Sequence, residues 1–341
     1  MLRMARYGTT RFWALWDGND LVAVVVYKKG ATELLRRLEA QAPAATRILR
    51  KEPPTMSVVV TGATGHLGRL VVASLLQRGV PAGEIVATGR NLDKIKDFAD
   101  RGVRTVQADF TDPQSLASAF AGAQKVLLIS GSEVGQRIAQ HTNAIEAAKA
   151  AGVELLVYTS VAGADTSTMI LAADHQGTEA VLAQAGVPYT LLRNSWYHEN
   201  YTGTLPATLE RGVIVGSAGQ GQVSGASRID YAEAAAVVLS TDGHAGAVYE
   251  LGGDTSYTQA DLAAEIAAQS GTPVTYQDIP VAEYEKMLAE VVGLPAPVAA
   301  MVADIDRGVR EGNLEITTGD LSRLIGRPTT PLSTAVATAL A

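Results

Sequence analysis

The chain contains no cysteine in its 341 residues, which excludes disulfide bonds, thiolate metal sites and cysteine nucleophiles. Its five histidines are scattered and no His-Glu-x-x-His pair occurs, so no metal site is predicted. A Gly-x-Ser-x-Gly elbow and a Gly-Lys-Ser/Thr phosphate loop are also missing. These absences argue against hydrolases with a nucleophile elbow and against P-loop NTPases.

Membrane and nucleic-acid partners are disfavoured as well. No apolar run approaches the roughly 20 residues needed to cross a bilayer, and the first residues lack the apolar segment and cleavage site of a signal peptide. The net charge of −7 argues against a general nucleic-acid-binding protein. We therefore expect a cytoplasmic protein with neither a membrane nor a nucleic acid as its partner.

The charge is divided unevenly along the chain. Residues 1–55 carry ten Lys/Arg and five Asp/Glu, whereas the remainder carries 18 and 30. The stretches 11–16 and 21–27 flank the turn Asp17-Gly18-Asn19-Asp20, which predicts a β-hairpin, and 31–41 has the pattern of a helix. We therefore predict an appended ββα module and linker over 1–55, with the linker over 43–55. The module is expected to dock on the acidic remainder or on a second subunit.

The most informative segment runs Val58-Val59-Val60-Thr61-Gly62-Ala63-Thr64-Gly65-His66-Leu67-Gly68. It combines a short buried strand, a glycine-rich turn and a helix start. Gly62 allows a tight exit from the strand, Gly65 lets backbone N–H groups approach a pyrophosphate, and Gly68 lets helix and strand pack closely. The spacing differs from the standard fingerprint, so a turn without a ligand is the alternative. The predicted cofactor-binding residues of this turn are Gly62, Ala63, Thr64, Gly65, His66 and Leu67.

Arg90 indicates which dinucleotide is bound. The NAD fingerprint places an Asp or Glu about 20 residues after the glycines, where it hydrogen-bonds the ribose hydroxyls. Here the strand over 84–88 ends in Arg90 without a carboxylate. A guanidinium suits a 2′-phosphate, which predicts NADPH rather than NADH, unless Arg90 caps the next helix or is only solvated. Asp109 follows the next strand and is predicted to border the adenine.

From Met56 onward strands and helices alternate. The predicted strands span 57–61, 84–88, 103–108, 125–130, 153–159 and 187–193. This alternation predicts an α/β fold with a doubly wound parallel sheet of the Rossmann type. We predict an NADP-binding domain over 56–194 plus about 231–255, in which 247–251 returns a strand to the sheet. A smaller C-terminal substrate lobe is predicted over 195–230 and 256–341.

Polar residues stand at the predicted carboxyl ends of the strands, where ligands bind in such folds. Ser130, Gly131, Ser132 and Thr159 are predicted to line the cofactor, although strand-end hydroxyls also satisfy backbone groups in proteins with no ligand. Asn194, Trp196 and Tyr197 follow the sixth strand and are predicted to meet the nicotinamide and a planar substrate. The alternative for the two aromatic residues is a contact that seals the two lobes.

Three segments carry a resemblance to a known family: Thr61–Gly68, Leu127–Arg137 and Tyr189–Tyr197. They are similar to the atypical short-chain dehydrogenase/reductases of the NmrA-like group, and within it to bacterial NADPH-dependent quinone oxidoreductases, with triphenylmethane reductases nearby. Leu324–Thr330 matches too, so the resemblance covers about 56–335. It implies an NADPH-dependent reductase that transfers a hydride to quinones or similar planar electrophiles.

The sequence lacks the usual proton donor of short-chain dehydrogenases. None of its eleven tyrosines is followed four residues later by lysine. A quinone is a better electrophile than a ketone, so positioning against the nicotinamide could supply most of the catalysis. His175 lies where the usual catalytic residues of the family would fall, either as a donor to substrate or ribose or as a structural residue. A non-catalytic NADP(H) redox sensor is the alternative function, and a homodimer is left open.

Overall fold

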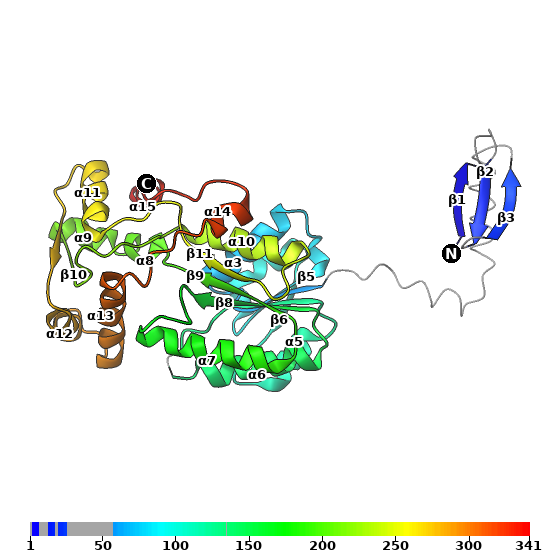
Figure 1. Cartoon of the computed structure of the whole chain (residues 1–341), viewed down its shortest axis with the longest axis horizontal. Helices are drawn as coiled ribbons and strands as arrows, with labels where there is room; N and C mark the ends of the chain where they lie inside the picture. The colour runs from blue at the N-terminus through cyan, green and yellow to red at the C-terminus, as the bar shows by residue number, and fades with distance from the viewer. Residues whose placement is uncertain (1, 7–12, 18–19, 26–56, 134) are drawn as a thin grey trace. The chain divides into compact units, whose positions relative to one another are not determined.

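The computed structural model describes residues 2–6, 13–17, 20–25, 57–133 and 135–341. The chain divides into two compact units, Met1–Thr55 and Met56–Ala341 (Figure 1).

The first unit contains a three-stranded antiparallel sheet in the order β1 (Leu2–Arg6), β2 (Trp13–Asp17) and β3 (Asp20–Val25). Strands β2 and β3 pair from Trp13↔Val25 to Asp17↔Asp20, with an irregularity between Leu15 and Trp16. The predicted hairpin is therefore confirmed, and β1 is an addition that turn chemistry did not indicate. The predicted helix over 31–41 lies outside the described residues, as does the linker that follows it.

The second unit is built on a seven-stranded sheet in the order β11-β9-β8-β7-β4-β5-β6, and every neighbouring pair is parallel. Its strands are β4 (Val58–Val60), β5 (Ile85–Gly89), β6 (Arg104–Gln107), β7 (Lys125–Leu128), β8 (Leu155–Val161), β9 (Tyr189–Asn194) and β11 (Val248–Leu251). The predicted Rossmann sheet is confirmed, including the strand that returns near 247–251.

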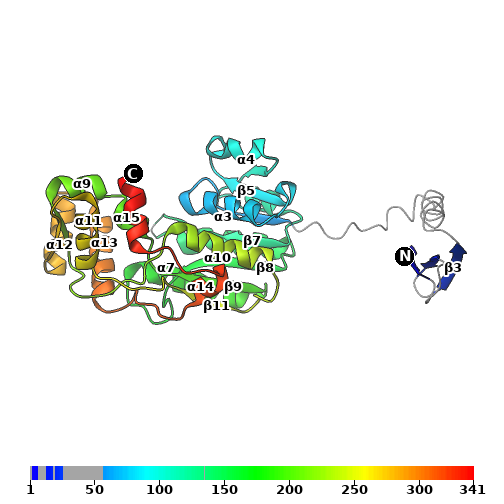
Figure 2. The same cartoon turned by 90° about the horizontal axis from the view of Figure 1, so that it is seen from above.

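Helices cover both faces of this sheet (Figures 1 and 2). Strand β4 shows why, because Val58 and Val60 enter one apolar core while Val59 enters the other. The first core is covered by α3 (His66–Gln77) and α10 (Arg228–Ser240), and the second by α5 (Pro113–Phe120), α6 (Arg137–Ala150) and α7 (Ile170–Ala185). Between β5 and β6 lie η2 (Leu92–Ile95) and α4 (Lys96–Asp100), and η1 (Ala82–Glu84) precedes β5.

A lobe adjoins the carboxyl ends of the strands, because Val161 at the end of β8 packs into the apolar core of that lobe. Its parallel strand pair joins Val213 to Thr275 and Gly216 to Asp278. The lobe elements are α8 (His198–Thr202), α9 (Leu205–Arg211), β10 (Val213–Gly216), α11 (Gln259–Ser270), β12 (Thr275–Asp278), α12 (Val281–Glu290), α13 (Ala296–Arg310) and α15 (Leu332–Leu340). The division of 56–341 into two domains stays a prediction, since these residues form one compact unit.

The C-terminal segment ties back to the sheet region. Helix α14 (Asp320–Ile325) packs against α10 and β11. Beyond it, Arg327 and Thr330 both donate to the carboxylate of Asp230, a fully buried residue near the start of α10. In the described part of the chain no helix has the length and apolar character that crossing a membrane requires.

Candidate functional site

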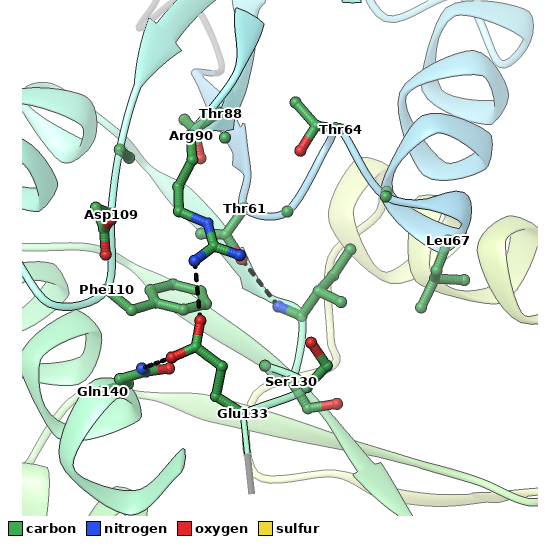
Figure 3. Close-up of a pocket in the computed structure, with 18 of the residues that line it drawn as sticks. Thr61, Thr64, Leu67, Thr88, Arg90, Asp109, Phe110, Ser130, Glu133 and Gln140 are labelled. Carbon is green, nitrogen blue, oxygen red and sulfur yellow. Dashed lines mark hydrogen bonds and ion pairs between the residues drawn. The ribbon is translucent and has the colours of Figure 1, made fainter. Parts of the chain in front are cut away.

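A pocket of about 280 Å³ lies at the carboxyl ends of β4, β5, β6 and β7 (Figure 3). Each of the four strands gives its following residues to the lining, and α6 adds one more. The lining residues are Thr61, Gly62, Thr64–Gly68, Thr88–Arg90, Ala108–Phe110, Ile129–Glu133 and Gln140. Parallel sheets bind ligands at this edge. Most of the residues predicted to bind the cofactor are thereby brought together.

The glycine turn after β4 has the geometry of a phosphate site. Gly62 has a φ of +61°, which only glycine adopts readily, and its carbonyl accepts from Gly65 N at 2.9 Å. A Cβ at Gly68 would lie 2.3 Å from the Gly62 oxygen. Helix α3 starts at His66, and no side chain caps its free N–H groups. The turn therefore presents the positive end of a helix to the pocket.

Ala63 differs from the rest of the turn. It is fully buried, its N–H donates to the Thr88 carbonyl at 2.8 Å, and it does not line the pocket. Its predicted role as a cofactor ligand stays a prediction. The observed contact joins the turn to the end of β5.

Arg90 reaches across the pocket mouth (Figure 3). Its Nη1 donates to Glu133 Oε1 at 2.9 Å, and Glu133 Oε2 accepts from Gln140 Nε2 at 2.8 Å. The Arg90 and Glu133 side chains are 68% and 44% exposed. An exposed pair of this kind contributes about 0–1 kcal/mol, so an incoming phosphate could displace the carboxylate. The pair places the Arg90 guanidinium at the end of the pocket where Glu133 and Gln140 lie.

Asp109 and Phe110 form the same end of the pocket from the strand β6 side. The Asp109 carboxylate accepts from Thr111 N at 2.8 Å and from Thr111 Oγ1 at 2.7 Å. These hydrogen bonds hold the pKa of Asp109 below its usual value, so the residue is ionised near neutral pH. The charged carboxylate is suited to accept from a polar edge of an adenosine.

Ser130, Gly131 and Ser132 line the pocket after β7, as predicted from their place at a strand end. Thr159 does not line it. Its side chain is buried, and its Oγ1 accepts from Ser130 N at 2.9 Å. Thr159 therefore contacts the pocket wall from behind, which corresponds to the alternative considered for strand-end hydroxyls.

His175 lies in the second turn of α7 and is 5% exposed. Its Nδ1 is 2.8 Å from the Tyr158 hydroxyl, and it does not line the pocket. Burial, reinforced by Arg137 nearby, lowers the pKa of His175 to about 3, so the ring is neutral at physiological pH. A catalytic role for His175 stays a prediction, and the observed contacts are those of a structural residue.

The three residues predicted to meet the substrate do not line this pocket; Asn194 is the last residue of β9, and Trp196 and Tyr197 follow it. Asn194 Nδ2 donates to the Tyr197 hydroxyl at 3.3 Å, and Asn194 Oδ1 is buried with no hydrogen-bond partner among the described residues. The Tyr197 ring packs against Tyr231 with 5.1 Å between centroids, whereas Trp196 packs against the lobe core. Their assignment to the substrate stays a prediction.

Sequence reasoning missed several residues that form the pocket or its support: Thr61, Gly89, Glu133, Gln140 and His141. Gly89 is required there because a Cβ would lie 2.5 Å from Thr64 Cγ2. Glu133 and Gln140 fall within or just after the segment Leu127–Arg137 that carried the family resemblance. Thr61 likewise opens the segment Thr61–Gly68, whereas no motif distinguishes Gly89 and His141, because each acts through a contact between separate elements.

Comparison with known proteins identifies one family. Residues 62–242 match the family described as NAD(P)H-binding. The chain is 51% identical over 279 residues to quinone oxidoreductase 2 of Escherichia coli strain K12, covering 82% of this chain and 97% of that protein.

Two solved structures are also similar. The first is a crystal structure of an NADPH-dependent quinone oxidoreductase from Escherichia coli in complex with NADPH; it is 50% identical, with a TM-score of 0.81, and the match covers 83% of this chain and all of that one. The second is the triphenylmethane reductase of a Citrobacter species complexed with NADP(H), at 39% identity and a TM-score of 0.78, again over 83% and 100% of the two chains.

Proposed function

The chain belongs to the NAD(P)H-binding family, in the NmrA-like group of atypical short-chain dehydrogenase/reductases, and we propose that it transfers a hydride from NADPH to quinones or similar planar electrophiles. The observation that carries the proposal is the near-complete coverage of a quinone oxidoreductase at 51% identity. The pocket at the strand ends agrees with it. A cytoplasmic location and a homodimer go with the proposal as expectations.

The residues of the pocket fit NADPH. The cradle formed by Gly62, Gly65 and Gly68 has no room for a Cβ at Gly68, so the start of α3 packs directly on the turn that would hold the pyrophosphate. Arg90 would hold the 2′-phosphate in place of its present partner Glu133. Asp109 and Phe110 would border the adenine.

The nicotinamide half would then extend along the sheet edge past β7. Ser130 and Ser132 would face the nicotinamide ribose. Asn194 at the end of β9, with Trp196 and Tyr197 after it, would meet the carboxamide and the substrate. NADPH supplies the hydride when bound. The unpartnered Asn194 Oδ1 gives this region one free acceptor among the described residues.

The sequence lacks the tyrosine that usually serves as proton donor in short-chain dehydrogenases. Tyr158 is fully buried, its hydroxyl contacts His175, and burial raises its pKa far above neutrality. The residue four positions later is Ala162. A quinone needs less help than a ketone because its reduced anion is stabilised, so orientation and exclusion of water are the main contributions of the protein.

The deciding experiment is NADPH oxidation by the full-length protein with a panel of benzoquinones, naphthoquinones and triphenylmethane dyes. We expect turnover with quinones and a preference for NADPH over NADH. Tight NADPH binding without turnover on the whole panel would refute the reductase and favour the redox-sensor alternative, which the buried Tyr158–His175 pair permits.

A matched pair of glycine variants tests whether turnover depends on the pocket. Gly68→Ala should abolish NADPH binding and turnover, because its Cβ would lie 2.3 Å from the Gly62 oxygen. Gly83→Ala is the control, since no atom lies within 4 Å of the added Cβ. Retained binding in Gly68→Ala would place the cofactor elsewhere.

A further inference from the structure

One wall of the pocket, residues 129–132, is held by side chains rather than by a strand ladder. Strand β7 ends at Leu128, and the next three backbone N–H groups each donate to a side chain of another element. These bonds run from Ile129 N to Thr61 Oγ1 at 3.0 Å, from Ser130 N to Thr159 Oγ1 at 2.9 Å and from Gly131 N to His141 Nε2 at 3.0 Å. Thr61 lines the pocket, whereas Thr159 and His141 do not, so two of the three bonds hold the wall from outside the pocket lining.

The contacts of His141 determine where its proton lies. Nε2 accepts from Gly131 N, so it carries no proton. Nδ1 is 2.9 Å from Thr178 Oγ1, and that hydroxyl donates its single proton to the Asp174 carbonyl. Nδ1 must then be the donor to Thr178. The ring is fully buried, and burial lowers its pKa to about 4, which agrees with a neutral ring.

Gly131 is held at its carbonyl as well. Arg137 Nε donates to the Gly131 oxygen at 2.5 Å, and Arg137 is itself 3.8 Å from the Asp174 carboxylate. A Cβ at Gly131 would lie 3.4 Å from Gln140 Oε1 and 3.8 Å from His141 Nε2, so the backbone lies close against α6. Helix α6 thus holds both peptide groups of a residue that lines the pocket.

We propose that His141 is a positioning residue for NADPH: its neutral ring, protonated at Nδ1, fixes Gly131 N–H and thereby turns the hydroxyls of Ser130 and Ser132 toward the cofactor. Both serines line the pocket, and their hydroxyls have no hydrogen-bond partner within the described ranges. This inference rests on the proposed function, because it assumes that the pocket holds NADPH.

Two substitutions at His141 separate its two hydrogen bonds. In His141→Asn the amide nitrogen takes the place of Nδ1 and still donates to Thr178, but nothing reaches Gly131. In His141→Gln the amide oxygen reaches the place of Nε2 and accepts from Gly131 N. The control is Thr142→Val on the next residue of α6, whose hydroxyl bonds only to the Ile138 carbonyl.

The full-length variants are titrated with NADPH and assayed with a quinone. We expect His141→Asn to raise Kd and KM for NADPH about tenfold, because a buried N–H group loses its acceptor. The kcat at saturating NADPH should change less than about twofold, and His141→Gln and Thr142→Val should stay near the wild type. Normal NADPH affinity in His141→Asn, or equal losses in the Asn and Gln variants, would overturn the proposal.

Two further measurements separate positioning from general stability. Nitrogen-15 spectra of histidine-labelled wild-type protein should show His141 with its proton on Nδ1, and a proton on Nε2 would overturn the proposal. If His141→Asn does not fold, Thr159→Val removes the acceptor of Ser130 N from the same wall and should weaken NADPH binding in the same way. Failure of wild-type protein to bind NADPH would instead refute the proposed function.

Discussion

Asp306 allows a quantitative prediction about the lobe. This α13 carboxylate is 9% exposed, and its Oδ2 accepts from Ser217 N at 2.7 Å. Burial raises the pKa of Asp306 to about 6 from an ordinary 3.8, although Ser217 N and Arg310 favour the charged form; Asp278 adds to the rise. The partly buried Tyr201, Tyr276 and Tyr284 side chains nearby are neutral near pH 7.

The sign and size of the effect follow from this pKa. The unfolded chain ionises Asp306 near 3.8 and the folded chain near 6, so the folded state binds this proton more tightly. The contribution of Asp306 to stability is therefore present below pH 3.8 and is lost as the pH rises through 6. A difference of about two pKa units corresponds to roughly 3 kcal/mol as an upper value.

The test is Asp306→Asn, which keeps an oxygen for Ser217 N and removes the ionisation. Urea unfolding should show this variant more stable than the wild type by roughly 1–3 kcal/mol at about pH 8, with the difference disappearing toward about pH 4. Asp278→Asn is the control, because its partner Arg310 holds the Asp278 pKa below its usual value and the variant should lose stability at about pH 8. A variant Asp306→Asn that is less stable than the wild type at about pH 8 would refute this reasoning.

Three further predictions concern the cofactor site and the buried histidines. Arg90→Glu should raise the Kd for NADPH at least about tenfold and leave NADH nearly unchanged, because a charge-assisted contact contributes roughly 1.5–3 kcal/mol; equal losses in a fluorescence titration would exclude a 2′-phosphate role. Glu133→Gln should lower the same Kd by up to about fivefold by freeing Arg90, and an unchanged Kd would contradict this competition. The free energy of unfolding should fall as the pH drops from 6.5 toward 4, because burial lowers the pKa of His141 to about 4 and the unfolded chain then binds more protons. In His141→Gln a pH series of unfolding curves should show a smaller fall than in the wild type. An equal fall in the two proteins would argue against the buried neutral ring.

The sequence predicted those parts of the site that depend on the backbone alone. The turn Gly62–Gly68 is recognisable because Gly62 needs its positive φ and a Cβ at Gly68 would meet the Gly62 carbonyl, and both requirements are local. The strand ends could also be predicted from the sequence, because the alternation of strands and helices places Ser130 and Asn194 at one edge of the sheet. Short strands such as β4 lie within one or two residues of their predicted bounds.

Long-range pairing could not be predicted in the same way. Glu133 meets Arg90 over a separation of 43 residues, and nothing near either residue indicates the contact. The His141 ring meets Gly131 only because α6 folds back under the β7 loop. The pKa of His175 is lowered by burial at a place where the ring contacts Tyr158, a residue of another element. The lobe strands β10 and β12 are short segments with no alternating pattern of their own, and each is a strand because the other lies beside it.

The tie between Asp230 and the C-terminal segment has a consequence for synthesis on the ribosome. The carboxylate of Asp230 is fully buried, and its partner Thr330 follows 100 residues later. At a translation rate of about 5–20 residues per second, roughly 5–20 seconds separate the two residues. During that interval the nascent sheet can pair its strands, but the start of α10 must keep Asp230 hydrated, because a buried carboxylate without partners is strongly unfavourable. Emergence of Arg327 and Thr330 from the ribosome is therefore the event that closes this side of the protein.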